Sequence, residues 1–386
     1  MRIRRARAEA FGALLGTEGP AAIVAVDRAL ARRVGVDGGA AWSGAEPPPE
    51  SLARLSAPTE VHLSVTERCP VGCRGCYADA APGGHEPSFA QLEERLGAIA
   101  AAGVFSVAFG GGEAMLREDL PRLAALARRL GLVPTVTTSG VGLDAARART
   151  LGDFAQVNVS HDGVGGAYRQ VRGVAGEGLA ERAMGCLREA GVPFGGNLAV
   201  HRDNFEAIEE TAARLEALGA VELQLVRWKP SGRARLDYLA SRCTEAQVDQ
   251  LPALLRRLSL RRLAIRIDCA LVPLLSGDPD LCPADLVRFG VLGCEAGRSL
   301  LAMRADGAVA GCSFWREEAP APRPGGELGW DAPALERFRA LHARLPEPCA
   351  SCALRPACRG GCRVVAAHAG DPAAPDPECP RVRPRR

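Results

Sequence analysis

The chain of 386 residues lacks the features that mark membrane, nucleic-acid-binding and secreted proteins. No apolar run approaches the roughly 20 residues that a membrane-spanning helix needs. The formal charge of +3 is close to balance, which argues against bulk nucleic-acid binding and against an electrostatic membrane anchor. The N-terminus is unlike a signal peptide, because Arg7 and Glu9 interrupt its start and Glu18 follows the short apolar run 10–15. We therefore expect a cytoplasmic protein with no membrane and no nucleic-acid partner.

Cysteine, in contrast, is abundant, with 14 residues. Thiols stay reduced in the cytoplasm, so metal binding explains them better than disulfides do. The hydrophobic content of 47% is that of a globular protein. The length allows one large domain and a smaller one, with a core that needs no disulfides.

From residue 61 onward, the sequence repeats a pattern of strand, loop and helix. The helices have apolar residues three and four apart, and Ser88 with Gln91 is a capping pair for the first of them. Such units predict a parallel sheet closed or partly closed into a barrel, with its active site beyond the carboxyl ends of the strands. The expected strands are 61–65, 104–109, 133–137, 156–160, 194–200 and 221–226, and the expected helices are 88–102, 116–130, 178–190 and 205–218.

The rest of the chain divides by composition. The start contains a strand-like run at 21–26, a helical piece at 28–34 and a linker at 38–51 that contains Gly, Pro and Ser. Beyond residue 281 the barrel pattern stops and cysteines return. We therefore assign an N-terminal extension and linker to 1–57, the barrel to 58–275, a Cys-rich domain to 282–380 and a basic tail to 381–386.

Three thiols follow the first barrel strand: Cys69, Cys73 and Cys76 are separated by three and then two residues. Three thiolates on one loop can hold three irons of a 4Fe–4S cluster and leave the fourth iron open. An open iron suits chelation of a methionine moiety and reductive cleavage of S-adenosylmethionine (SAM) to a 5′-deoxyadenosyl radical. A zinc loop or three unrelated cysteines is the alternative. With Tyr77 beside Cys76, the spacing resembles the C-x3-C-x2-C signature of the radical SAM superfamily.

The resemblance extends to the ends of the next strands and implies a partial (β/α)6 barrel. Gly110-Gly111-Gly112-Glu113, Thr138-Ser139-Gly140 and Ser160-His161-Asp162-Gly163 look like the family's elements at these places, and Arg172-Gly173 looks like its R-G element. His161 stands where the family often has Leu, so we interpret it chiefly as a scaffold residue. The resemblance implies that SAM is bound by Gly111, Gly112, Glu113, Ser139, Ser160, Asp162 and Arg172.

The spacing of seven distal cysteines resembles the SPASM extension of radical SAM enzymes, which binds two auxiliary 4Fe–4S clusters. Cys282 is the nearest candidate for a fourth ligand of the first cluster, which otherwise has an open iron. Isolated Cys186, Cys243 and Cys269 are expected to be buried spectators. The resemblance implies Cys294, Cys312 and Cys362 as ligands of the first cluster, and Cys349, Cys352, Cys358 and Cys379 as ligands of the second.

The segments around these cysteines look like those of peptide maturases of the mycofactocin type. A sulfatase-maturing enzyme is argued against, because Ser313 stands where that branch has Asp after its cysteine. The resemblance implies a SPASM radical SAM oxidoreductase. It would abstract hydrogen from a precursor peptide or protein, leading to a crosslink, a decarboxylation or a similar oxidation, with electrons from a flavodoxin or ferredoxin.

Three further points stay open in the sequence. The general base is unassigned, with Glu317, Glu318 and His161 as weak candidates. The region 1–57 is a candidate for a partial peptide-recognition element. An enzyme acting on a small molecule or haem precursor is the main alternative function, and a non-catalytic Fe–S electron carrier or zinc scaffold is a third.

Overall fold

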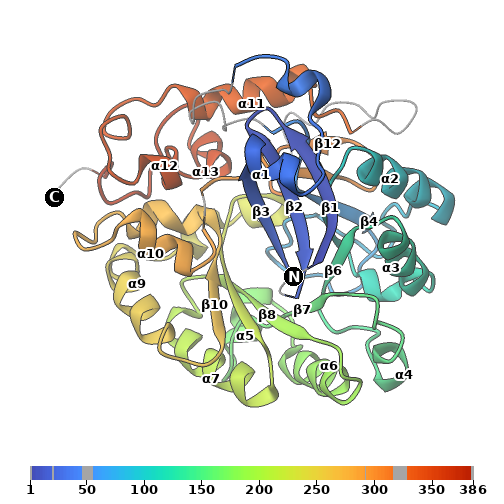
Figure 1. Ribbon diagram of the computed structural model, residues 1–386. Coiled ribbons are helices and arrows are strands. Elements are labelled where there is room, and N and C mark those ends of the chain that lie inside the picture. The colour runs from blue at the N-terminus through green and yellow to red at the C-terminus, as the bar shows by residue number, and fades with distance from the viewer. Residues whose placement is uncertain (1, 20, 46–54, 292, 316–327, 384–386) are drawn as a thin grey trace.

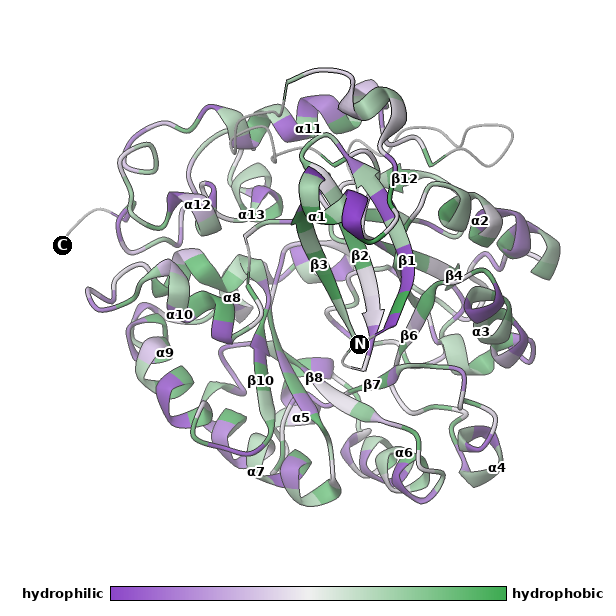
Figure 2. Ribbon diagram, in the orientation of Figure 1, coloured by the Kyte–Doolittle hydropathy of each residue, from purple (hydrophilic) through white to green (hydrophobic). Residues whose placement is uncertain are grey.

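The computed structural model describes residues 2–19, 21–45, 55–291, 293–315 and 328–383. A nine-stranded sheet curves into an open barrel, with helices on its outside and a small antiparallel sheet crossing it in the view of Figure 1. The helices around the barrel show both green and purple bands in Figure 2, as amphipathic helices do. In the described residues, no helix is both long enough and apolar enough to cross a membrane.

The predicted barrel is confirmed. Six strands lie side by side in chain order and pair in parallel. In the first strand the apolar Val61, Leu63 and Val65 are fully or almost fully buried, whereas His62 and Ser64 between them are half-buried. Successive side chains of a strand point to opposite faces, so one face of this strand packs in the core. The strands are β4 (Glu60–Thr66), β5 (Ser106–Gly111), β6 (Val133–Thr138), β7 (Gln156–Ser160), β8 (Phe194–Val200) and β9 (Glu222–Arg227).

The four predicted barrel helices are present with small shifts at their ends. Ser88 caps the first with a complete capping box that includes Gln91. The fourth begins as a short 3-10 turn, η4 (Phe205–Ala207), before α7. The helices of the barrel region are α2 (Phe89–Ala101), α3 (Leu120–Arg129), α4 (Ala145–Ala148), α5 (Ala167–Arg172), α6 (Glu177–Glu189), α7 (Ile208–Leu218), α8 (Tyr238–Ser241) and α9 (Glu245–Leu258).

Three further strands extend this sheet beyond the prediction. β10 (Ala264–Ile267) pairs in parallel with β9 at one end. At the other end β11 (Leu300–Met303), from the Cys-rich segment, pairs in parallel with β4, and β12 (Val309–Ala310) pairs antiparallel with β11. The sheet therefore crosses the boundary that the sequence suggested between barrel and Cys-rich domain. The helices of this segment are α10 (Pro283–Arg288), α11 (Pro333–Ala343), α12 (Arg355–Cys358) and α13 (Arg363–His368).

The N-terminal region is more ordered than predicted. β1 (Arg2–Glu9), β2 (Gly12–Glu18) and β3 (Ala22–Asp27) form an antiparallel sheet, followed by α1 (Arg28–Arg33). Only the last strand and the helix were predicted. Four arginines among the eight residues of β1 hide its strand pattern in the sequence. Part of the expected linker, 46–51, lies outside the described residues.

The N-terminal sheet covers the end of the barrel where its strands begin. Arg7 Nη1 donates to Pro58 O at 2.7 Å and to Gly103 O at 3.2 Å, just before β4 and β5. The guanidinium of Arg7 also lies over the Phe105 ring, 5.5 Å from its centroid. The cysteine loop leaves the opposite end of β4. A peptide-recognition role for this region stays a prediction.

A buried ion pair joins the barrel to the Cys-rich segment. Arg227, the last residue of β9, is 3% exposed, and Asp376 is 1% exposed. Two contacts connect them, Nη1 to Oδ2 at 2.6 Å and Nη2 to Oδ1 at 3.1 Å. Asp376 Oδ2 also accepts from the Cys362 backbone N–H at 3.1 Å. This carboxylate therefore positions a predicted cluster ligand and attaches it to the barrel.

We predict that Asp376→Asn lowers the melting temperature markedly. Removing this charge leaves Arg227 with Glu378 as its remaining carboxylate partner, at 3.0 Å, and breaking a buried pair costs at most about 3–5 kcal/mol. The matched control is Glu209→Gln, which breaks the surface pair Arg257–Glu209 and should leave stability unchanged. The melting temperatures of wild type, Asp376→Asn and Glu209→Gln are measured by thermal unfolding, monitored by circular dichroism. Equal melting temperatures for Asp376→Asn and wild type would contradict it.

Candidate active site

The three thiols of the predicted radical SAM motif lie together on the loop after β4. Cys69 interacts electrostatically with both Cys73 and Cys76, and Cys73 with Cys76. The loop is held by its own backbone: the Cys69 N–H donates to Ala81 O at 2.9 Å, and the Cys76 N–H donates to Cys73 O at 3.3 Å. Each thiol is partly exposed, so metal and ligand can reach it.

The segment 226–234 packs directly on this loop. Arg233, in η5 (Gly232–Arg235), donates from Nε to Cys73 O at 3.1 Å and from its backbone N–H to Cys76 O at 3.0 Å. Gly75 lies so close to the Trp228 ring that a Cβ there would be 1.8 Å from a ring carbon. Arg233 therefore fixes the loop, a role that sequence reasoning missed because these contacts are 160 residues apart in the chain.

Glu113 of the Gly-Gly-Glu element connects the ends of β5 and β6. Its side chain is buried and accepts from Thr138 Oγ1 at 2.7 Å and from the Ser139 N–H at 2.8 Å and Oγ at 2.5 Å. Its own backbone N–H donates to Arg68 O at 2.8 Å, directly before Cys69. The carboxylate thus holds Ser139 and the start of the cysteine loop in one arrangement.

Asp162 and Arg172 form a second connection to the loop. Asp162 accepts from Arg172 Nε at 2.6 Å and from the Ala199 N–H at 2.7 Å. Arg172 Nη1 in turn lies 3.5 Å from Cys73 Sγ, as a donor. Although burial opposes it, the Asp162 carboxylate raises the pKa of Arg172, so this cation is permanent. Ser160 ends β7 beside Asn197 of β8.

His161 lies within the scaffold. It is fully buried, and its ring nitrogens have no hydrogen-bond partner among the described residues. Nε2 lies 3.6 Å from Glu181 Oε1, too far for a normal hydrogen bond. Burial lowers the pKa of His161 despite the nearby carboxylate, so the ring is neutral near pH 7.

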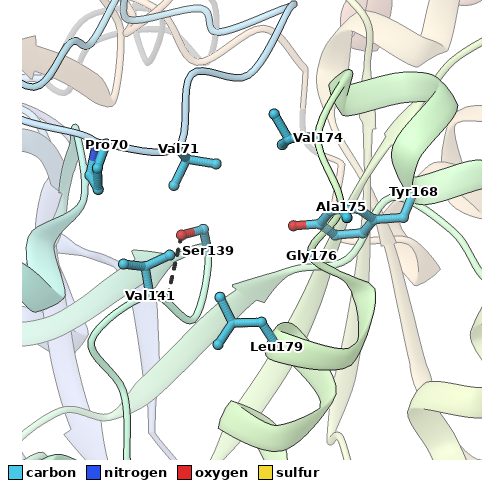
Figure 3. Close-up of a pocket in the computed structure, with 9 residues that line it drawn as sticks. All are labelled: Pro70, Val71, Ser139, Val141, Tyr168, Val174, Ala175, Gly176 and Leu179. Atoms are coloured by element: carbon cyan, nitrogen blue, oxygen red, sulfur yellow. Dashed lines mark hydrogen bonds between the residues drawn. The ribbon is translucent and has the colours of Figure 1, made fainter.

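A pocket of about 180 Å³ lies between the cysteine loop and the start of α6. Figure 3 shows Val71, Ser139 and Val141 on one side of it and Tyr168 on the other, with the Tyr168 hydroxyl pointing into the space. Of the predicted SAM-binding residues, Ser139 lines it. The remaining lining residues are Pro70, Val174, Ala175, Gly176 and Leu179.

The distal thiols gather in two groups. Cys312 interacts electrostatically with Cys294 and Cys362. Cys358 interacts in the same way with all three other members of its group. The first group is Cys294, Cys312 and Cys362, and the second is Cys349, Cys352, Cys358 and Cys379.

The turn between Cys358 and Cys362 requires glycine. Arg359, Gly360 and Gly361 all have positive φ, at 51°, 82° and 86°. A Cβ on Gly361 would lie 2.3 Å from the Asp376 Cβ. This turn directs Cys358 to the second group and Cys362 to the first.

The remaining predicted site residues lie elsewhere. Cys282 is exposed and stands directly before α10, where its N–H donates to Asp285 Oδ2 at 2.9 Å. Glu317 and Glu318 lie outside the described residues. In the basic tail, Arg381 Nε donates to Ser276 O at 2.8 Å, so that part of the tail is attached to the fold.

The donor chemistry of the site fits iron–sulfur clusters. In the part of the chain that the structure describes, no three His, Cys, Asp or Glu side chains are close enough to share one metal ion. In a cluster each cysteine binds a different iron, so its ligands do not meet at one atom. Burial raises the pKa of Cys312 to about 12 and of Cys362 to about 11, so neither is an activated nucleophile.

Comparisons with known proteins show the family to which the chain belongs. The model of the radical SAM superfamily matches residues 63–215. PqqA peptide cyclase of Rhodopseudomonas palustris is 31% identical over 334 residues, which cover 83% of this chain and 86% of that protein. PqqA peptide cyclase of Xanthomonas axonopodis pv. citri is 31% identical over 349 residues, covering 84% and 88%.

Solved structures share the fold. SuiB of Streptococcus suis bound to S-adenosylmethionine has a TM-score of 0.75 at 18% identity and covers 97% of this chain and 98% of its own. The protein named anSMEcpe, with bound AdoMet, has a TM-score of 0.64 at 18% identity and covers 83% and 94%. The family match and the PqqA peptide cyclase relatives show that the chain belongs to the radical SAM superfamily.

Proposed function

We propose that this enzyme binds SAM beside a 4Fe–4S cluster on Cys69, Cys73 and Cys76 and oxidatively modifies a precursor peptide. The observation that carries the proposal is Arg172, whose guanidinium joins the Asp162 carboxylate to the Cys73 sulfur. When bound, the cluster and SAM supply the 5′-deoxyadenosyl radical; the chemistry belongs to these cofactors, whereas binding and aim belong to the protein.

The residues at the strand ends bind and orient SAM. Gly111 and Gly112 lie against the start of the cysteine loop, where a Cβ on either would be 2.2 Å from the carbonyl oxygen of Thr66 or Arg68. Glu113 holds Ser139 at the wall of the pocket. Ser160, Asp162 and Arg172 provide polar groups on the neighbouring strands. Val71, Val141 and Leu179 exclude water from the pocket. A reaction in such a site depends on how precisely the binding groups are held in place. The buried hydrogen bonds of Glu113 and Asp162 hold the SAM-binding groups in fixed positions.

The two distal thiol groups would hold auxiliary 4Fe–4S clusters, which transfer an electron from the oxidised substrate or bind it. Their thiols converge as two groups, and a zinc scaffold would offer no redox function. An external reductant such as a flavodoxin or ferredoxin would reduce the first cluster in the cytoplasm. Transfer of the peptide substrate class from the PqqA peptide cyclases rests on similarity over most of both chains.

The test is turnover with SAM. Anaerobically reconstituted and reduced protein should form 5′-deoxyadenosine, and a precursor peptide encoded beside the gene should lose hydrogen or carbon dioxide, both measured by mass spectrometry. The Cys76→Ala variant is the control and should form neither product. Formation of 5′-deoxyadenosine without any change in such a peptide would favour a small-molecule substrate. No 5′-deoxyadenosine from wild type would contradict an enzymatic function altogether.

We predict that Arg172→Gln slows 5′-deoxyadenosine formation about 10- to 100-fold, because hydrogen bonds to charged groups are worth about 1.5–3 kcal/mol. The rate is measured with SAM in excess and normalised to bound iron. Arg169→Gln, on the same short helix but exposed, is the matched control and should behave as wild type. Equal rates for Arg172→Gln and Arg169→Gln would exclude this role.

We predict that His161→Leu removes part of the acid sensitivity of the fold. Because burial lowers the pKa of His161, its neutral form stabilises the protein above about pH 6.5, the unfolded value, and this stability is lost as the pH falls toward the folded pKa. The melting temperature of wild type should therefore fall more between pH 8 and pH 5.5 than that of the variant. His368→Leu, at an exposed position, is the control. A loss of SAM cleavage at pH 8 in His161→Leu with unchanged stability would indicate a chemical role instead.

A further inference from the structure

Cys269 is a thiol that no spacing pattern in the sequence assigns to a metal site. It begins the 3-10 helix η6 (Cys269–Leu275), directly after β10. The carboxyl end of β10 belongs to the same edge of the sheet as the strand ends that carry the active site. The chain therefore brings a barrel cysteine to the edge that the Cys-rich segment covers.

The Cys269 side chain contacts the first group of distal thiols. The Ala270 carbonyl beside it is joined through Arg227 and Asp376 to the Cys362 backbone N–H. The Cys269 thiol lies close enough to the Cys294 thiol to interact with it. It also interacts electrostatically with Cys362, which in turn interacts with Cys312. Four thiols from separate parts of the chain are therefore neighbours, in the number that a fully ligated 4Fe–4S cluster needs.

The residues on both sides of Cys269 are fixed by buried cations. The preceding residue, Asp268, is ion-paired with Lys229. The carbonyl of the following residue, Ala270, accepts from Arg227 Nη1 at 2.9 Å. Because both neighbours are anchored, the position of the Cys269 thiol is set before any metal binds.

Lys229 places a positive charge beside this group of four thiols. It is the only lysine in the sequence, and its side chain is 5% exposed. Its ammonium lies 3.8 Å from the centre of the Phe314 ring and interacts electrostatically with Cys362 and Cys312. A buried cation beside several thiolates offsets their negative charge, as second-shell groups of metal sites do.

We propose that Cys269 is the fourth protein ligand of the first auxiliary cluster, so that this cluster has no iron open to substrate. The inference rests on the auxiliary clusters proposed above and adds a ligand from the barrel to them. On binding iron, the thiol loses its proton and coordinates as a thiolate. The first cluster would then be built from both the barrel and the Cys-rich segment.

Two other residues compete for this place. Cys282 was the sequence-based candidate, but it is exposed and its backbone caps α10. His342 lies beside Cys294, and imidazole is a known cluster ligand. Each competitor therefore needs a variant of its own in the test.

The experiment uses the full chain in which Cys69, Cys73 and Cys76 are alanine, so that only auxiliary clusters remain. After anaerobic reconstitution, iron and sulfide are counted and the reduced protein is examined by electron paramagnetic resonance (EPR). This parent should hold about eight irons in two clusters. Cys269→Ala should lower the count to about four or change the EPR signal of one cluster. Cys186→Ala, on α6, is the matched control and should leave the count and the spectrum of the parent unchanged.

Cys269→Ser keeps a ligand oxygen and should retain iron with a shifted midpoint potential, which covers the case in which the alanine variant does not fold. A parent without iron would overturn both this inference and the proposed auxiliary clusters. About eight irons with unchanged spectra and potentials in Cys269→Ala and Cys269→Ser would overturn the inference alone. The inference would also be overturned if Cys282→Ala or His342→Ala, rather than Cys269→Ala, altered the cluster. A Cys269–Cys294 disulfide in the reconstituted protein, found by alkylation and mass spectrometry, would overturn it as well.

Discussion

The buried ion pair between Arg227 and Asp376 is the interaction on which the position of the distal cysteines relative to the barrel depends. Arg227 ends the last predicted barrel strand, and its guanidinium also contacts the Ala270 carbonyl and the Glu378 carboxylate, the latter at 3.0 Å. Asp376 accepts from the Cys362 backbone. Burying these charges is costly, so the pair is favourable only with nearly all of its hydrogen-bonding groups satisfied. That requirement fixes where the Cys-rich segment meets the barrel.

A second set of contacts connects the two ends of the site. Ser231 Oγ donates to Phe314 O at 2.9 Å, two residues beyond Cys312. The Phe314 ring lies 4.9 Å from the ring of Tyr77, which follows Cys76. The loop for the first cluster and the distal thiols therefore touch through aromatic side chains. In a radical enzyme this proximity suits both electron transfer and the exclusion of water from the substrate.

The six barrel strands were predictable because their apolar residues recur, at alternate positions in most of them, between turn residues. Their order followed from the repeated pattern of strand, loop and helix. β10 and β11 were not predictable, because four-residue strands are stabilised by the neighbours they pair with and have little pattern of their own. The N-terminal sheet was largely missed because arginines interrupt the apolar alternation of β1. Its Arg7 is buried because the Glu9 carboxylate and the backbone carbonyls of Ala57 and Pro58, just before β4, accept its hydrogen bonds.

In the candidate site, too, local sequence patterns predicted some residues and missed others. Motifs with short, fixed spacing, such as Cys69 to Cys76, could be read directly. Arg233 and Cys269 could not, because their partners lie far away in the chain and no local pattern marks them. Cys282 was favoured in the sequence for its proximity to Cys294 along the chain, whereas folding brings Cys269 to that thiol.

The most direct test of the central claim is the position of iron in the reconstituted protein. An anomalous-scattering map recorded at the iron edge from crystals of the full chain locates every metal centre independently of turnover. We expect three separate iron centres: one at Cys69, Cys73 and Cys76, and two among the distal thiols. Iron at the first position alone, or single zinc ions at the distal cysteines, would contradict this account.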